Sequence, residues 1–125
     1  MDSAATVACT DDEKAFIQFV VETIHKENKG YSSLRVDKVD KAARGVDAMK
    51  KYRNKFGNME GCLKSPATAL VIEIKDSVAQ LRSQEDFDKA VAAGVITDGC
   101  KVAYEAEAKA YAEKQALFNS WGGEA

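Results

Sequence analysis

The residue types that most often carry chemistry are few in this chain of 125 residues. His25 is the only histidine, so a histidine-rich metal site is excluded. Cys9, Cys62 and Cys100 form no Cys-x-x-Cys pair, and their spacing indicates neither a zinc site nor a thioredoxin-like motif. The pattern Glu-x-x-His occurs once, at Glu22 and His25, whereas a di-iron centre in a helical bundle needs two such pairs. We expect no bound metal and no cofactor.

Acid–base chemistry is not indicated either. His25 falls in the last turn of a predicted helix, where the helix dipole favours a solvated, positively charged imidazole. Glu105 and Glu107 are two positions apart on a predicted helix and therefore do not face each other. We expect no catalytic residues, and a protein that is not an enzyme.

The segment GNMEGCLKS, residues 57–65, superficially resembles a phosphate-binding loop. Its second glycine, Gly61, does not adjoin Lys64, so the nest of backbone N–H groups around a phosphate is not specified. A helix rather than a buried strand is predicted before it. What remains is a weak anion site, in which Lys64 lies beside the free N–H groups of the following helix.

Positive charge is concentrated in the middle of the chain. Residues 26–64 contain eleven Lys and Arg against five Asp and Glu, although the whole chain has a net charge of −2. On a helical wheel Lys41, Arg44, Lys51 and Lys55 lie opposite the apolar side of the helix predicted to end at about Phe56, and Lys64 is adjacent to them across the following loop. We call this set the basic stripe: Lys41, Arg44, Lys51, Lys55 and Lys64.

The basic stripe has two interpretations. It is either an ordinary solvated face paired with local acids, or a contact surface for an anionic partner such as an acidic protein, a nucleic-acid backbone or anionic lipid. No aromatic residues are interleaved with it, so base stacking is not indicated. The thiol of Cys62 is expected to lie exposed beside it.

A second candidate surface lies near the C-terminus. Tyr104, Tyr111 and Phe118 are spaced by seven, and Trp121 follows them in an alanine-rich segment. This aromatic edge either packs in the core or forms a protein interface, in which Tyr and Trp are favoured anchors.

Helical periodicity and capping signals predict the elements that position these residues. The first helix begins with a capping box at Thr10 and Glu13, has a broad apolar stripe that makes it central, and ends near Gly30. The other expected helices run from Ser32 or Ser33 to about Phe56, from Ser65–Pro66 to Leu81, from Ser83 to Gly94, and from about 99 to 119.

No sustained alternation of apolar and polar residues indicates a strand. The predicted fold is therefore all-α: a single-domain antiparallel bundle, residues 1–125, of four main helices plus one short helix, with residues 1–9 and 122–125 frayed.

We expect a non-enzymatic subunit or adaptor in a protein assembly, with a protein partner or self-association. The alternatives are a small apolar-ligand or lipid carrier, and weak, salt-dependent binding of nucleic acid through the basic stripe. No signal peptide and no apolar run of transmembrane length is seen, so we expect an intracellular, cytoplasmic protein with reduced thiols. The sequence does not decide whether a disulfide forms between Cys62 and Cys100 or between Cys9 and Cys100.

Overall fold

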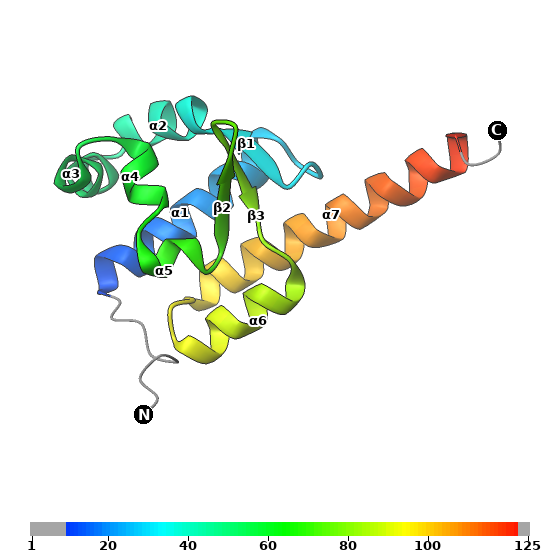
Figure 1. The fold of residues 1–125 in the computed structure, drawn as a ribbon. Coiled ribbons are helices and arrows are strands. Elements are labelled where there is room, and N and C mark those ends of the chain that lie inside the picture. The colour runs from blue at the N-terminus through cyan, green and yellow to red at the C-terminus, as the bar shows by residue number, and fades with distance from the viewer. Residues whose placement is uncertain (1–9, 123–125) are drawn as a thin grey trace.

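The computed structural model describes residues 10–122, which form seven helices and one three-stranded antiparallel sheet (Figure 1). In chain order the elements are α1 (Asp11–Glu27), β1 (Ser33–Arg35), α2 (Val36–Arg44), α3 (Asp47–Phe56), α4 (Met59–Leu63), α5 (Pro66–Ala69), β2 (Ile72–Lys75), β3 (Val78–Leu81), α6 (Gln84–Ala93) and α7 (Asp98–Gly122). The prediction of an all-α bundle of four main helices plus one short helix is wrong, because of this sheet and because two of the predicted helices are broken.

The helix predicted from Ser65 to Leu81 is a single turn, α5, followed by a β-hairpin. Residues 72–75 read Ile-Glu-Ile-Lys, and the alternation places Ile72 in the core and Glu73 in solvent. Asp76 and Ser77 form the two-residue turn, both with positive φ (52° and 63°), as in the hairpin turns that match strand twist. β3 is the central strand of the order β1–β3–β2, and Leu34 of β1 pairs with Ala79.

The helix predicted from residue 32 or 33 to Phe56 is interrupted twice. Its first residues form strand β1, and it breaks again between α2 and α3, where Gly45 ends one helix and Val46 is extended (φ −123°, ψ 115°). Val46 and Phe56 of this segment are exposed large hydrophobic residues.

Several local predictions are confirmed. Thr10 and Glu13 form the capping box of α1, and the Ser83 side chain caps α6 by accepting from the Asp86 N–H. Gly94 ends α6 in the left-handed conformation (φ 80°). The Thr97 hydroxyl accepts from the Cys100 N–H (3.0 Å) at the start of α7. Helix α7 begins one residue before its predicted start and ends three residues after its predicted end.

α1 is the central element, as its broad apolar face predicts. Its buried side chains are Phe16, Ile17, Val20, Val21, Thr23 and Ile24. It packs against α2, α3, α5, β1 and, most extensively, α7. The predicted fraying of residues 1–9 and 123–125 falls outside the described residues, and residue 122 is the last of α7.

Helix α7 is partly inside and partly outside the body. Figure 1 shows its first half running along the body beside α6, and its second half projecting beyond the other described helices and strands. Of the helices within residues 10–122, none combines the length and the apolar character that crossing a membrane requires.

Candidate protein interface along α7

The base of α7 is held in the core by one continuous face of the helix. Cys100, Tyr104 and Glu107 lie on this face and are all buried. The Tyr104 ring stacks on Phe87 with ring centroids 3.8 Å apart, and its hydroxyl donates to the Arg82 carbonyl oxygen. Tyr104, which the sequence placed in the aromatic edge, is therefore a core residue and not part of an exposed surface.

Glu107 fastens α7 to α1 and to the loop that follows it. Its carboxylate lies 2.6 Å from Nδ1 of His25 and accepts the backbone N–H groups of Gly30 (3.0 Å) and Ser32 (2.5 Å). Gly30 and Ser32 both have positive φ (88° and 56°), which turns their N–H groups toward one acceptor. A fully buried carboxylate needs such partners, because burial without them is costly.

The prediction of a solvated His25 is wrong. Its side chain is 25% exposed, and it is paired with Glu107. The sequence signal that was missed is Glu107 itself, which falls between Tyr104 and Tyr111 on the face predicted to be apolar.

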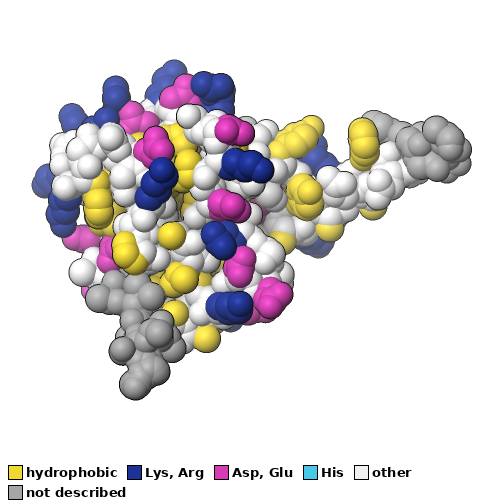
Figure 2. Space-filling view, in the orientation of Figure 1, with side chains coloured by type: hydrophobic (Ala, Val, Ile, Leu, Met, Phe, Trp, Pro, Cys, Tyr) yellow, Lys and Arg dark blue, Asp and Glu magenta, His cyan; other side chains and the backbone are white. Residues whose placement is uncertain are grey.

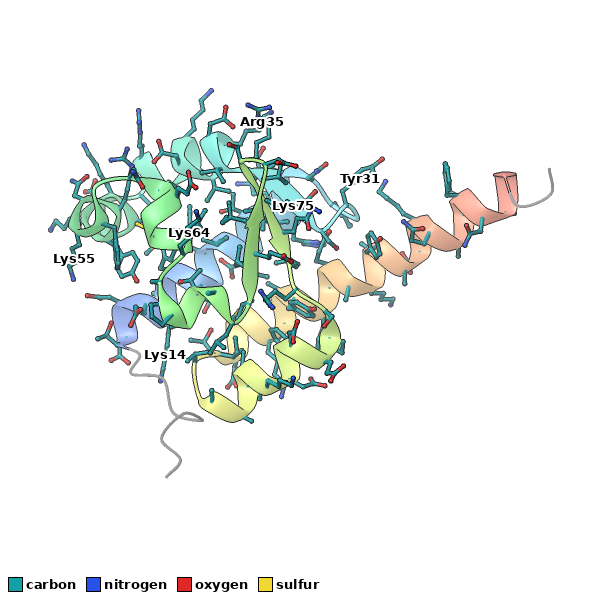
Figure 3. The ribbon with its side chains drawn as sticks, in the orientation of Figure 1. Lys14, Tyr31, Arg35, Lys55, Lys64 and Lys75 are labelled. Carbon is teal, nitrogen blue, oxygen red and sulfur yellow. The ribbon has the colours of Figure 1, made fainter. Side chains whose placement is uncertain are left out.

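The loop fastened by Glu107 contacts α7 a second time, further along the helix. Nζ of Lys114 lies 4.7 Å from the centroid of the Tyr31 ring, a cation–π contact. The stem of Lys114 crosses Gly30 so closely that a Cβ at Gly30 would lie 2.5 Å from Cε. Figure 3 shows Tyr31 on this loop, beside the point where α7 leaves the body.

A surface groove of about 500 Å³ opens between this loop and α7. Its lining consists of Gly30, Tyr31, Lys114, Gln115, Leu117 and Phe118. Two aromatic rings and a leucine therefore line one concavity that opens to solvent. No pattern in the sequence indicates that Tyr31 would lie beside residues 83 or more positions later.

We call residues 111–122 the arm. The side chains from Tyr111 to Ser120 are all exposed, including Tyr111 (42%), Leu117 (50%) and Phe118 (69%). Trp121 lies in the last turn of α7, and its side chain is outside the part of the chain that the structure describes. Figure 2 shows hydrophobic side chains spaced along this projecting segment.

The face that buries the base of α7 continues onto the arm. At 100° per residue, the following side chains fall within roughly 80° of arc, and we call them the α7 stripe: Cys100, Tyr104, Glu107, Tyr111, Lys114 and Phe118. Its first three members are buried, whereas Tyr111 and Phe118 are uncovered. The exposed part is thus the same face that elsewhere forms the core.

The arm offers little charge to a partner. Glu113 and Lys114 are its only charged residues, and Glu113 lies on the side opposite the α7 stripe. Lys114 lies on the stripe, but its ammonium group is drawn back over Tyr31. An aromatic, charge-poor patch of this kind is typical of the core of a protein interface.

The basic residues singled out from the sequence do not share one helix. Lys41 and Arg44 belong to α2, Lys51 and Lys55 to α3, and Lys64 is the C-cap of α4. All five are exposed, and Figure 2 shows Lys and Arg side chains over α2 and α3 with acidic ones among them.

Three of the five basic residues are paired with acids. Arg44 contacts Asp40 (2.9 Å), Lys64 contacts Glu60 (2.9 Å), and Lys55 lies 3.8 Å from Asp12. Among the residues described, Lys41 and Lys51 have no ion pair. Figure 3 places Lys55 on α3 and Lys64 beside α4.

Both described cysteines are buried free thiols. The expectation of an exposed Cys62 is wrong: its Sγ lies 3.7 Å from the Arg53 carbonyl oxygen. Burial raises the pKa of Cys62 to about 11 and that of Cys100 to about 12. No disulfide joins these two residues, and Cys9 lies outside the described part.

Comparison of the chain with protein-family models, with curated proteins and with solved structures finds no match.

Proposed function

We propose that this protein is a non-enzymatic subunit or adaptor of a protein assembly, and that it docks through the arm of α7. The observation that carries the proposal is the continuity of the α7 stripe, buried at Tyr104 and Glu107 and uncovered at Tyr111 and Phe118. The same helix face that forms the core is presented to solvent where the body ends.

Exposed aromatic side chains at this density favour a docking role. Burying one Phe or Leu side chain contributes on the order of 2 kcal/mol, and the arm exposes Tyr111, Leu117 and Phe118. Aromatic residues near the centre of a patch are the usual anchors of a protein interface. The groove beside Tyr31 gives a partner side chain a concave surface next to these anchors.

Helix stability supports the same role. The arm has 12 residues, and an isolated helix of that length is marginal in water. Its alanines, Ala112 and Ala116, favour the helix, but within residues 10–122 no other helix or strand covers its apolar face. A partner that covers the α7 stripe would supply the missing tertiary packing.

A photo-crosslinking pair tests this proposal. Phe118 and Val102 are almost equally exposed (69% and 67%) but lie on opposite sides of α7. Benzoylphenylalanine is introduced at either position, and the protein is irradiated in an extract of the cells that naturally express it. The proposal predicts a discrete protein adduct from position 118 and none from position 102. Equal labelling from both positions, or no protein adduct from position 118, contradicts it.

A further inference from the structure

We infer that the chain binds the ring of a neutral sugar in a small surface pocket between the sheet and α7, at the foot of the arm. This pocket has a volume of about 290 Å³, and we call it the tyrosine pocket. Its lining consists of three tyrosines, two serines, a glutamine and a leucine: Tyr31, Tyr104, Tyr111, Ser32, Ser33, Gln80 and Leu81. Tyr31 also lines the groove of about 500 Å³, whose other lining residues are different.

Hydrogen bonds hold the walls of the tyrosine pocket together. The N–H of Ser32 donates to Glu107 of α7 (2.5 Å), and the carbonyl oxygen of Ser32 accepts the N–H of Leu81, the last residue of β3 (2.9 Å). The Tyr104 hydroxyl joins α7 to the chain after β3, since it donates to the Arg82 carbonyl oxygen. The pocket is therefore formed before a ligand arrives, which lowers the entropic cost of binding.

Tyr31 is fixed as well, although its side chain is 59% exposed. Its N–H donates to the Asn28 carbonyl oxygen (3.0 Å), and the ammonium group of Lys114 lies over its ring. The next residue, Ser32, has a positive φ of 56°, a conformation that costs free energy in residues other than glycine and that is concentrated at functional sites. An exposed ring held in this way gives a ligand a preformed platform.

The side chains that line the tyrosine pocket favour a neutral ligand. Among the described residues, those in its lining include no charged side chain, in a chain of which 30% of the residues are charged. Phosphate groups are bound chiefly by Lys and Arg. Lys114 lines the neighbouring groove instead, and Arg35, further along β1, is paired with Asp37 (3.1 Å).

The polar side chains of the tyrosine pocket suit hydroxyl groups. Ser33 and Gln80 are paired in the register of β1 and β3, so their side chains lie side by side on one face of the sheet. Neither side chain is hydrogen-bonded to another described residue. A serine hydroxyl and a glutamine amide can each donate and accept hydrogen bonds, and so can each hydroxyl of a sugar.

The aromatic side chains suit the ring of a sugar. Tyr31 comes from the loop and Tyr111 from α7, so exposed aromatic surface lines the pocket from two elements. One face of a pyranose ring presents C–H groups that pack on an aromatic ring, while its hydroxyls reach polar groups at the edge. The volume lies at the lower end of the range for small-molecule sites, about 300–1,000 Å³, so we expect one sugar ring to occupy it.

A titration followed by proton–nitrogen correlation NMR tests the inference. The probes are the neutral methyl pyranosides of gluco, galacto and manno configuration and N-acetylglucosamine, added to about 50 mM because an open, uncharged site should bind on the order of 1 mM. At least one sugar should give saturable shifts of the amide signals of Tyr31, Ser33 and Gln80, and glycerol, which has hydroxyls but no ring, should not. No saturable shift with any of these sugars, or equal shifts with glycerol, overturns the inference.

A matched pair of variants assigns the binding to the tyrosine pocket. Tyr111 and Phe56 are similarly exposed (42% and 39%), but Phe56 ends α3 and does not line the pocket. Tyr111→Ala should weaken sugar binding roughly tenfold, whereas Tyr111→Phe, which keeps the ring, and Phe56→Ala should leave it nearly unchanged. Equal weakening by Tyr111→Ala and Phe56→Ala overturns the inference.

A nucleoside distinguishes the other planar ligand that aromatic side chains bind. Bases of single-stranded nucleic acid also stack on tyrosine rings. Uridine is therefore titrated under the same conditions, and we expect it to bind more weakly than the best sugar. Tighter binding of uridine than of every sugar would identify a base-stacking site and overturn the sugar inference.

The failure of this inference is distinguishable from that of the proposed function. The titration uses the purified protein alone, and position 118, where the photo-crosslinker is placed, does not line the tyrosine pocket. Sugar binding without a photo-adduct supports the inference and removes the docking role. A photo-adduct without sugar binding has the reverse meaning.

Discussion

Glu107 and His25 are 82 positions apart in the sequence, yet the carboxylate oxygen of one lies 2.6 Å from Nδ1 of the other. This contact joins the end of α1 to the base of α7. The same carboxylate holds the backbone of Gly30 and Ser32, so one side chain sets the position of the loop that borders the arm. The direction in which the arm leaves the body therefore depends on Glu107.

Replacing Glu107 should destabilise the fold. Glu107→Ala removes the partner of His25 and the acceptor of the Gly30 and Ser32 N–H groups, for an expected loss of about 3 kcal/mol in the free energy of unfolding. Glu107→Gln keeps one carbonyl oxygen and should lose less. Urea unfolding followed by circular dichroism measures both. A loss below about 0.5 kcal/mol for Glu107→Ala would show that these hydrogen bonds contribute little.

A side chain at Gly30 should be tolerated poorly, for two separable reasons. The positive φ of 88° is unfavourable for alanine, and the added Cβ would collide with the stem of Lys114. We expect Gly30→Ala to cost roughly 1–3 kcal/mol of unfolding free energy.

A double-mutant cycle separates the two reasons. In a Lys114→Ala background only the backbone cost at Gly30 should remain, so the effect of Gly30→Ala should be smaller there. An identical loss with and without Lys114 would contradict the contact between Lys114 and Gly30. Thermal or urea unfolding of the four proteins provides the measurement.

The protein should lose stability in alkaline solution. Burial raises the pKa of Cys62 to about 11 and that of Cys100 to about 12, above the ordinary thiol value of 9.0. The folded state thus favours the protonated thiols. Their contribution is fully present below pH 9 and is lost as the pH rises through 11 and 12.

A control variant isolates the thiol contribution. Unfolding free energy is measured from pH 8 to pH 11 for the wild type and for Cys100→Ala, which has no thiol to ionise at that position. We expect a shallower decline for Cys100→Ala. An equally steep decline in both proteins would show that Cys100 does not contribute to the pH dependence.

The sequence predicted helix ends better than it predicted the elements between them. Thr10, Ser83 and Gly94 act within one turn of the chain, and their capping roles are visible locally. The hairpin was missed because Ile74, Val78 and Leu81 also fit a helical spacing, and because its turn contains no glycine. Tertiary pairing of β3 with β1 decides between the two conformations.

Only some residues of the candidate interface could be predicted from the sequence. The spacing of seven residues identified Tyr111 and Phe118, which are exposed. It also placed Tyr104 in the same surface, although Tyr104 is buried. Periodicity along a helix does not reveal where the body that covers the helix ends. Tyr31 could not be found this way, because its place beside Lys114 depends on the Glu107 contacts made across the fold.

Amide hydrogen exchange of the arm tests the central claim most directly. An uncovered 12-residue helix should exchange rapidly, whereas a covered one should be protected. We predict that protection of residues 111–122 rises when the wild type is mixed with the protein that position 118 captures and does not rise in Phe118→Glu, while the amides of α1 are unchanged in both. Arm amides that exchange at one rate with and without that partner would contradict the account.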